Sequence, residues 1–394
     1  MSRPVVFLVA LVVGSLVPCL SAQDSKSKTN TVYDVPKTCP AKIEFRRWSG
    51  ELNVPDPVAI SFDNQGRAFV TQTQRRKSQD LDIRQNTDWI PNDLGFRSVK
   101  DKRDFYHRTL SPETDGKRRP KQRVQDLNKD GSRDWRDLMM ISEKIRIFED
   151  TDGNGTADRA NLYAEDFKTE VTGIAAGVLA HSGDVYATIA PDVWRLTDTN
   201  GDGKANKREV MATGFGVHIA YAGHDMHGLT VGPDGKMYWS VGDKGISVMS
   251  KEGRKYLYPN QGGVMRCNPD GTDFEVFAHG LRNVQELAFD QFGNLFSIDN
   301  DADMPTERER FVYIVPGMDA GWRCNYQYRG DDYNPWTDEK LWQLWHPQQP
   351  SYIIPPIKHS LNGPAGFAFN PGTCLLYTSP SPRDQRGSRM PSSA

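Results

Sequence analysis

The sequence predicts an all-β chain built from β-propeller blades, and three observations carry that prediction. A hairpin signature recurs along the chain, with apolar alternation on both sides of a Gly-containing turn. The turn glycines of three middle copies, Gly183, Gly235 and Gly293, stand 52 and 58 residues apart, the spacing of four-stranded blades with long loops. Hydrophobic residues make up 37% of the chain, enough for a sizeable core and too many for wholesale disorder.

Each copy of the signature has an apolar-alternating strand, a turn that needs Gly, Asn or Asp at positive φ, and a second strand. The five copies begin at Pro57, Gly173, Leu229, Gln285 and Ala365. A β-sandwich is the alternative architecture, but its strands need not repeat one hairpin signature five times. We therefore expect successive propeller blades.

Residues 75–145 interrupt the first blade. The stretch is rich in Lys and Arg and has weak periodicity apart from a short helix expected around Ser98–Tyr106. A basic docking surface is one interpretation. A solvated, partly helical insertion in the first blade is the commoner outcome, and we predict that.

The two ends of the chain are expected to lie outside the propeller, which we place at 45–373. A basic residue, a short apolar run and a small residue at the cut predict a secretory signal over 1–22, followed by a linker over 23–44. An uncleaved anchor is the alternative, but the run is short for a span. Residues 374–394 resemble a translated sequencing adapter rather than a natural Ser/Pro/Arg linker, so the propeller is expected to be truncated in blade five or six.

Charge and cysteine content narrow the partners and the compartment. With 49 Lys+Arg against 51 Asp+Glu the net charge is −2, which argues against nucleic acid as a partner. No second segment is apolar and long enough to cross a membrane. An exported protein, whether periplasmic, cell-surface or secreted, can hold one disulfide, and Cys267–Cys324 is the pair we expect. The chain has no Cys-x-x-Cys for zinc or covalent haem.

Three stretches follow the spacing of a calcium loop, with oxygen ligands at positions 1, 3, 5, 7, 9 and 12 and Gly at position 6. The first has Asp198, Asn200, Asp202, Lys204, Asn206 and Glu209 at these positions. The second has Asp126, Asn128, Asp130, Asp134 and Asp137. The third has Asp150, Asp152, Asn154 and Asp158. Strand-like residues precede two of the loops, so we expect structural calcium between blade strands rather than EF-hands. Ordinary Asp-Gly hairpins are the alternative.

A second constellation of residues suggests a reaction. His224 precedes the third hairpin copy, and Arg282 and Asn283 precede the fourth. Strand starts at one rim of a propeller converge on its central channel, so these side chains are expected to face one another. A histidine can take a proton near neutral pH, and an arginine can stabilise developing negative charge on oxygen.

Two motifs carry a family resemblance: His224 followed by Gly232-Pro-Asp-Gly-Lys-Met-Tyr-Trp-Ser-Val-Gly-Asp-Lys-Gly245, and Gly280-Leu-Arg-Asn-Val-Gln-Glu-Leu-Ala-Phe-Asp290. They resemble the quinoprotein glucose/sorbosone dehydrogenases, six-bladed propellers that use pyrroloquinoline quinone. The wider chain resembles a family of membrane-bound dehydrogenase-like proteins of planctomycete-type bacteria over most of 45–373. Full-length members of that family often carry a haem-binding domain further on.

The resemblance implies roles for particular residues. His224 would take the hydroxyl proton of a sugar or related alcohol, Arg282 would stabilise the reduced quinone's oxygen, and Asn283 would position cofactor and substrate. Asp299 and Asp301 stand where the dehydrogenases use Gly-Pro carbonyls to hold a cofactor-bridging calcium, so they could add side-chain oxygens. Electrons would pass to a haem partner, either in a missing C-terminal part or in trans. The alternative is a non-catalytic, calcium-stabilised propeller that binds carbohydrate or protein.

Overall fold

The computed structural model describes residues 47–118, 124–300, 309–323, 356–359 and 366–369. The expected signal segment, linker and C-terminal tail lie outside these ranges, as do Asp301 and Cys324. The chain divides into two compact units. The larger comprises Val54–Glu149 and Ala160–Pro371, and the smaller comprises Met1–Asn53, Asp150–Arg159 and Gly372–Ala394. Among the described residues, no helix combines the length and apolar character that a membrane span requires.

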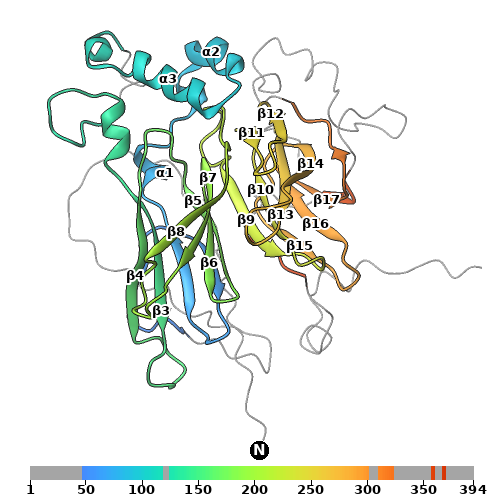
Figure 1. The fold of residues 1–394 in the computed structure, drawn as a ribbon. Coiled ribbons are helices and arrows are strands. Elements are labelled where there is room, and N and C mark those ends of the chain that lie inside the picture. The colour runs from blue at the N-terminus through green and yellow to red at the C-terminus, as the bar shows by residue number, and fades with distance from the viewer. Residues whose placement is uncertain (1–46, 119–123, 301–308, 324–355, 360–365, 370–394) are drawn as a thin grey trace, which may run out of the picture. The chain divides into compact units, whose positions relative to one another are not determined.

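Four larger sheets follow one another along the described part of the chain (Figure 1). Three of them have four strands, and the third along the chain has a fifth strand at its edge. The first contains β1 (Pro57–Phe62), β2 (Ala68–Gln72), β3 (Glu143–Glu149) and β4 (Arg159–Phe167). The second contains β5 (Ala175–His181), β6 (Asp184–Ile189), β7 (Asp192–Thr197) and β8 (Lys207–Thr213). The third contains β9 (Met226–Val231), β10 (Met237–Val241), β13 (Gly262–Cys267) and β14 (Glu275–Leu281). The fourth contains β15 (Leu287–Phe289), β16 (Leu295–Asp299), β17 (Arg310–Ile314) and β19 (Lys358–His359).

Two shorter features accompany the third sheet. A separate hairpin, β11 (Ile246–Met249) and β12 (Lys255–Tyr258), lies between β10 and β13 in sequence. The short strand β18 (Met318–Asp319) returns after the fourth sheet's β17 and pairs in parallel with β14. This return brings Trp322, which closely follows β18, back toward the third sheet.

The sheets are arranged as propeller blades. The first strands of successive sheets, β1, β5, β9 and β15, contact one another in that order. Close approach of these strands requires glycine: a Cβ on Gly177 of β5 would stand 3.1 Å from the Gly228 carbonyl oxygen of β9. A Cβ on Gly228 would in turn stand 3.1 Å from the Gln285 carbonyl oxygen, just before β15. The all-β propeller-like prediction is confirmed, with four blades among the described residues.

Four of the five predicted hairpin copies are confirmed as β1–β2, β5–β6, β9–β10 and β15–β16. The fifth copy differs from the prediction, because its described residues, 366–369, carry no strand. A strand is defined by its hydrogen-bonded partner, and the residues expected to form that partner lie beyond 369, outside the described ranges.

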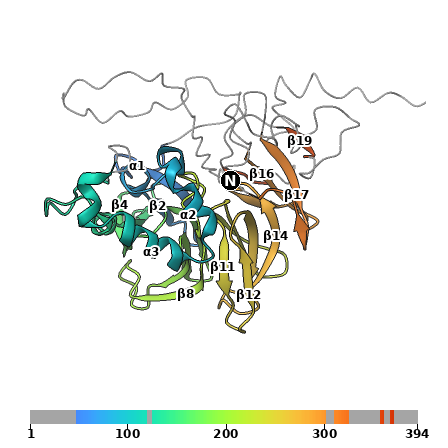
Figure 2. The same ribbon diagram turned by 90° about the horizontal axis from the view of Figure 1, so that it is seen from above.

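The segment between β2 and β3 is helical, as expected. It contains α1 (Arg75–Ser78), η1 (Ile83–Gln85), η2 (Thr87–Trp89), α2 (Ile90–Gly95), α3 (Val99–Thr109), η3 (Pro112–Lys117) and η5 (Trp135–Met139). The predicted helix around Ser98–Tyr106 is α3, and the Ser98 side chain caps it by accepting the Asp101 backbone N–H. The labelled helices gather at one end of the first two sheets (Figures 1 and 2).

Two buried charged residues anchor the base of this insertion. The Arg75 guanidinium donates to the carbonyl oxygens of Leu138 at 2.7 Å and Thr172 at 3.1 Å. The Glu143 carboxylate accepts the backbone N–H of Ala175 at 2.6 Å, and burial raises its pKa despite its hydrogen bonds. Both side chains tie the insertion's ends to the start of the second blade.

Apolar side chains from neighbouring sheets fill the spaces between blades. One cluster joins the second and third sheets through Tyr186, Val193, Met226 and Trp239. Cys267 belongs to this cluster, and within the described part of the chain it is a buried free thiol rather than half of a disulfide. A separate cluster forms the core of the insertion, and it includes residues of the segment that leads to His224.

Candidate active site around His224

His224 and Asp243 form a hydrogen-bonded pair at one end of the third blade. His224 precedes β9 and Asp243 follows β10, and the pairing of Met226 with Val241 places the two positions at the same end of the hairpin. His224 Nδ1 lies 2.8 Å from Asp243 Oδ1. An ionised carboxylate can only accept, so Nδ1 carries a proton, and in the neutral imidazole Nε2 is then the acceptor.

The Asp243 carboxylate is buried and held ionised. Its Oδ2 accepts the indole N–H of Trp322 at 3.0 Å, and Trp322 is itself fully buried. Burial acts to raise the pKa of Asp243, but the attraction of His224, the hydrogen bonds and the Arg282 charge outweigh it and leave the pKa below its ordinary value. The pair therefore has the arrangement of an oriented general base.

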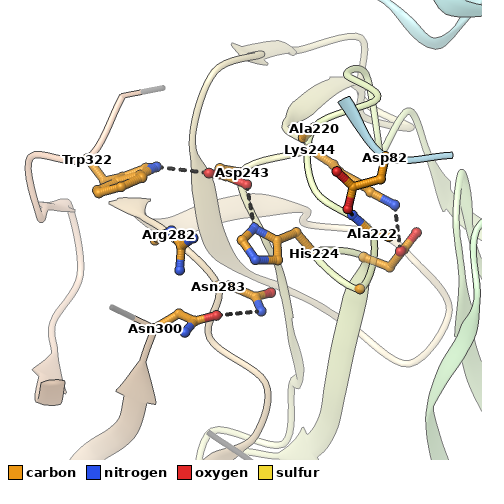
Figure 3. Close-up of polar contacts among 12 residues, drawn as sticks. Asp82, Ala220, Ala222, His224, Asp243, Lys244, Arg282, Asn283, Asn300 and Trp322 are labelled. Atoms are coloured by element: carbon orange, nitrogen blue, oxygen red, sulfur yellow. Dashed lines mark hydrogen bonds and ion pairs between the residues drawn. The ribbon is translucent and has the colours of Figure 1, made fainter. Parts of the chain in front are cut away.

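Arg282 and Asn283 lie beside the imidazole, as predicted (Figure 3). The Arg282 guanidinium stands over the rings of Trp322 and Tyr221 at 5.4 and 5.7 Å. Tyr221 also contacts His224, with 5.5 Å between ring centroids. Tyr221 thus borders both the imidazole and the guanidinium.

Asp299 orients the backbone that carries these two residues. Its carboxylate accepts the backbone N–H of Arg282 at 3.0 Å and that of Asn283 at 2.8 Å. It also accepts the Arg310 guanidinium at 2.7 Å. Asp299 was predicted to bind cofactor, and the structure places it behind the site as a support, while Asp301 lies outside the described residues.

The site fits one end of a polar, anionic cofactor. Asn283 donates its amide N–H to Asn300 Oδ1 at 3.3 Å, whereas its own Oδ1 is buried with no hydrogen-bond partner among the described residues. A Cβ on Gly242 would lie 2.7 Å from that oxygen and 2.9 Å from His224 Cβ, so only glycine allows Asn283 and His224 to approach each other this closely. The buried Arg282 cation is compatible with a negatively charged cofactor, and the Asn283 oxygen is compatible with a hydrogen-bond donor on that cofactor or on a substrate.

Three contributors to the site were not predicted. Asp243 appeared only within the motif that ends at Gly245, where it was assigned no role, and Trp322 was not singled out. Tyr221 has no motif of its own. The position of Asp243 two residues after a predicted strand, beside the strand that follows His224, is the signal from which this partner could have been found.

A second layer of charge lies directly behind the pair. Asp225 follows His224 and Lys244 follows Asp243, and Lys244 Nζ is 2.7 Å from Asp225 Oδ2 and 2.8 Å from Asp80 Oδ1 of the insertion. Burial acts to lower the pKa of Lys244, but the two carboxylates outweigh it and raise the pKa. Adjacent residues beside β9 and β10 therefore form two pairs: His224 with Asp243, and Lys244 with Asp225. Lys244 also contacts Asp80 of the insertion.

The predicted calcium loops differ in how their carboxylates are used. In the smaller unit, carboxylate oxygens of Asp150, Asp152 and Asp158 lie within 4.8 Å of one another, a spacing that a metal ion could bridge. The Asp198 loop joins β7 to β8, and Asp198 accepts the backbone N–H of Gly201 and Gly203.

Other members of the predicted calcium sets have protein partners. Glu209 lies on β8, where it pairs with Lys207 at 3.0 Å. Asp134 and Asp137 form a capping box at the start of η5. Asp126 accepts the Gly131 backbone N–H, and Asn128 and Asp130 bond to each other. These loops are turns between strands or before a 3-10 helix, in agreement with the expectation that they are not EF-hands.

A cavity of about 400 Å³ lies apart from His224, against α3 and β7. Its lining includes Arg103, Lys168, Trp194 and Arg208. Arg103 is paired with Glu170 at 2.9 Å, and Lys168 is paired with Asp166 at 2.9 Å. Because the charges of Arg103 and Lys168 are matched within the protein, the cavity carries a weaker indication of a ligand than the His224 site.

A family model described as a domain of unknown function, DUF7133, matches residues 38–312, more than half of the chain. The chain belongs to the DUF7133 family. The match includes the insertion, His224, Asp243, Arg282 and Asn283. No protein of curated function matches this DUF7133 chain.

Solved structures with a similar fold to the DUF7133 chain include the PQQ-bound aldose sugar dehydrogenase of Streptomyces coelicolor, at 16% identity and a TM-score of 0.38. That alignment covers 68% of this chain and 63% of the Streptomyces chain. An oxidoreductase (glucose dehydrogenase) of Thermus thermophilus is 19% identical, with a TM-score of 0.41 and coverage of 80% and 74%. The pyranose dehydrogenase PQQ domain of Coprinopsis cinerea is 14% identical, with a TM-score of 0.33 and coverage of 66% and 48%. The chemistry of the site therefore has to follow from the DUF7133 chain's own residues.

Proposed function

We propose that this protein is an exported oxidoreductase that oxidises a sugar or related alcohol with a pyrroloquinoline quinone-type cofactor. The single observation that carries the proposal is the His224–Asp243 pair with Arg282 and Asn283 at its side. A base with a free Nε2, next to a buried cation, is suited to remove a hydroxyl proton while negative charge develops nearby.

The chain's residues would divide the work as follows. His224 Nε2 accepts the hydroxyl proton, and the ionised Asp243 stabilises the imidazolium that results. The quinone, when bound, supplies the acceptor for the hydride that leaves the carbinol carbon. Arg282 presents positive charge to the cofactor's oxygen, and Asn283 offers its unsatisfied Oδ1 as a hydrogen-bond acceptor for substrate or cofactor.

Further parts of the proposal concern the whole protein. We propose six blades, of which four are described here, and export to the periplasm, the cell surface or the medium. Electrons would leave the reduced cofactor for a haem protein or domain. Sequencing the transcript beyond codon 373 tests the blade number and the haem domain together.

The direct test is reduction of an artificial electron acceptor by the purified full chain with calcium, quinone and a panel of aldoses. We expect acceptor reduction that depends on both quinone and sugar, and its loss in His224→Gln. His181→Gln, at the β5–β6 turn, is the matched control and should keep activity. Absence of quinone uptake together with silence across the panel would reject the enzyme.

A second function has one observation in its favour. The convergence of Asp150, Asp152 and Asp158 favours calcium binding by the third loop, whether or not the protein is an enzyme. If the dehydrogenase assay fails and calcium binding holds, a calcium-stabilised propeller that binds carbohydrate or protein becomes the better description.

A further inference from the structure

We propose that the helical insertion is a working part of the His224 site, because Asp80, Asp82 and Asp93 hold the segment 217–223 and thereby fix the imidazole against Asp243. They act as positioning residues, since each touches the backbone ahead of His224. An effect of these carboxylates on turnover rests on the proposed function, whereas their effect on the orientation of the imidazole does not.

Carboxylates of the insertion take up backbone donors along this segment. Asp93 Oδ1 accepts the Ile219 N–H at 2.8 Å, Asp82 Oδ2 accepts the Ala222 N–H at 3.1 Å, and Asp80 Oδ2 accepts the Gly223 N–H at 2.9 Å. Buried backbone donors need partners, and here side chains about 130–140 residues earlier supply them. The segment's path into His224 is therefore determined by the insertion.

Side chains of the same segment pack into the insertion's core. Val217, Ile219 and Tyr221 alternate along the chain and are buried in one cluster with Phe96 and Phe105. The Arg84 guanidinium stands 4.4 Å from the Tyr221 ring centroid. Because Tyr221 contacts both Arg84 and His224, packing reaches from the insertion to the imidazole.

The insertion also binds the strand ends that carry the pair. Lys244 bridges Asp80 of the insertion and Asp225, which lies just before β9. Lys244 follows Asp243 in sequence, and Asp225 follows His224. Lys102 of α3 adds a hydrogen bond to the Gly216 carbonyl oxygen. The Asp80 carboxylate thus contacts the chain beside both members of the pair: Lys244 next to Asp243, and the Gly223 N–H next to His224.

The backbone of the segment shows why such support is needed. Ala220 has φ of +47°, a left-handed conformation that non-glycine residues adopt only when their surroundings impose it. Its carbonyl oxygen accepts the Ile83 N–H at 3.0 Å, and Ile83 begins η1. Without the insertion's bonds, the segment would relax and the imidazole would lose its fixed orientation.

The test reads the imidazole directly, by NMR of the quinone-free full chain labelled with ¹⁵N-histidine. The variants are Asp80→Asn, Asp82→Asn and the double change, which keep side-chain size while removing the charge. Asp104→Asn, an exposed carboxylate of α3 paired with Lys100, is the matched control. In the wild type we expect a His224 signal of one tautomer with Nδ1 protonated and a slowly exchanging Nδ1 proton.

We expect each site variant to speed exchange of the Nδ1 proton by about tenfold, and the double variant to show mixed tautomers. The control should match the wild type. An unchanged His224 spectrum in the double variant, with the protein folded by circular dichroism, would overturn the proposal. If the double variant unfolds, the single variants decide on the same criterion.

Measurements of sugar oxidation distinguish the positioning role of these carboxylates from the proposed dehydrogenase activity. If the wild type oxidises a sugar, the variants should lose kcat by about 10²-fold with little change in KM, because none of these carboxylates contacts substrate. If the wild type is inactive on every sugar while the variants alter the His224 spectrum, the positioning role stands and the dehydrogenase falls.

Discussion

His224 Nδ1 and Asp243 Oδ1 are 2.8 Å apart although nineteen residues separate them in the chain. The distance follows from an antiparallel hairpin, because a residue just before β9 and a residue just after β10 must meet at the same end. Trp322, which lies just after the short edge strand β18, then covers the other side of the carboxylate by donating its indole N–H to Asp243 Oδ2. The hydrogen bond to Asp243 fixes the orientation of the imidazole ring and leaves Nε2 as the nitrogen that can take a proton from a substrate.

Replacing Asp243 with Asn should leave the geometry in place and remove the function of the pair. The amide can donate to Nδ1, which favours the wrong tautomer and leaves Nε2 protonated, so kcat should fall by roughly 10⁴-fold. Steady-state kinetics with quinone and the active sugar measures this, and His181→Gln serves as control. A variant with wild-type kcat would show that His224 is not the base.

Titration of the buried Lys102 amine should make the free energy of unfolding increase with pH in the alkaline range. Burial and the nearby Lys244 charge lower its pKa to about 8, whereas a lysine in the unfolded chain titrates near 10.4. Between those pH values the unfolded chain binds more protons than the folded chain, so the free energy of unfolding increases with pH. Lys102→Met removes this contribution, so its free energy of unfolding relative to wild type should fall by about 3 kcal/mol from pH 8 to 10.4.

Urea unfolding at several pH values measures that difference. Lys100→Met, an exposed neighbour on α3, should run parallel to wild type over the same range. A Lys102→Met difference that does not change with pH would mean that the lysine stays charged in the folded protein.

Calcium should stabilise the protein through the Asp150 loop. A ligand that binds only the folded state at about a hundred times its Kd adds about 2.7 kcal/mol, so a chelator should lower Tm. Asp150→Asn with Asp152→Asn should abolish the chelator's effect, because two of the three converging carboxylates lose their charge. Asp198→Asn with Asp202→Asn tests the β7–β8 loop in the same way, and equal Tm values with and without chelator in the wild type would reject bound calcium.

Cys267 should be unreactive in the folded protein. It is buried between the second and third blades, and burial raises the pKa of its thiol to about 12, so almost no thiolate forms near neutral pH. A thiol reagent should modify it only after denaturation, as followed by mass spectrometry of the peptide that contains it. Rapid modification without denaturant would contradict the packing of this blade interface.

Local patterns were sufficient for the blades and for much of the site. Alternation and turn glycines predicted β9–β10 and β15–β16, because strand period and turn chemistry are properties of neighbouring residues. The positions of His224, Arg282 and Asn283 before successive first strands predicted that they would meet. Of the fifth copy only residues 366–369 are described, and they carry no strand, because a strand also needs a hydrogen-bonded partner that the pattern of neighbouring residues does not supply.

Tertiary structure alone decided which partner each of these residues has. Nothing in the spacing of the insertion indicated that Asp80 and Asp82 would bond to the backbone at 222–223, because hydrogen bonds across some 140 residues leave no periodic trace. Likewise, Asp299 was expected from the sequence to offer its oxygens to a cofactor. In the structure its carboxylate is buried and accepts the backbone N–H of Arg282. The sequence therefore determines the repeating blade and the residue types at its rim, whereas burial and long-range hydrogen bonds determine which of them act and which hold the others in place.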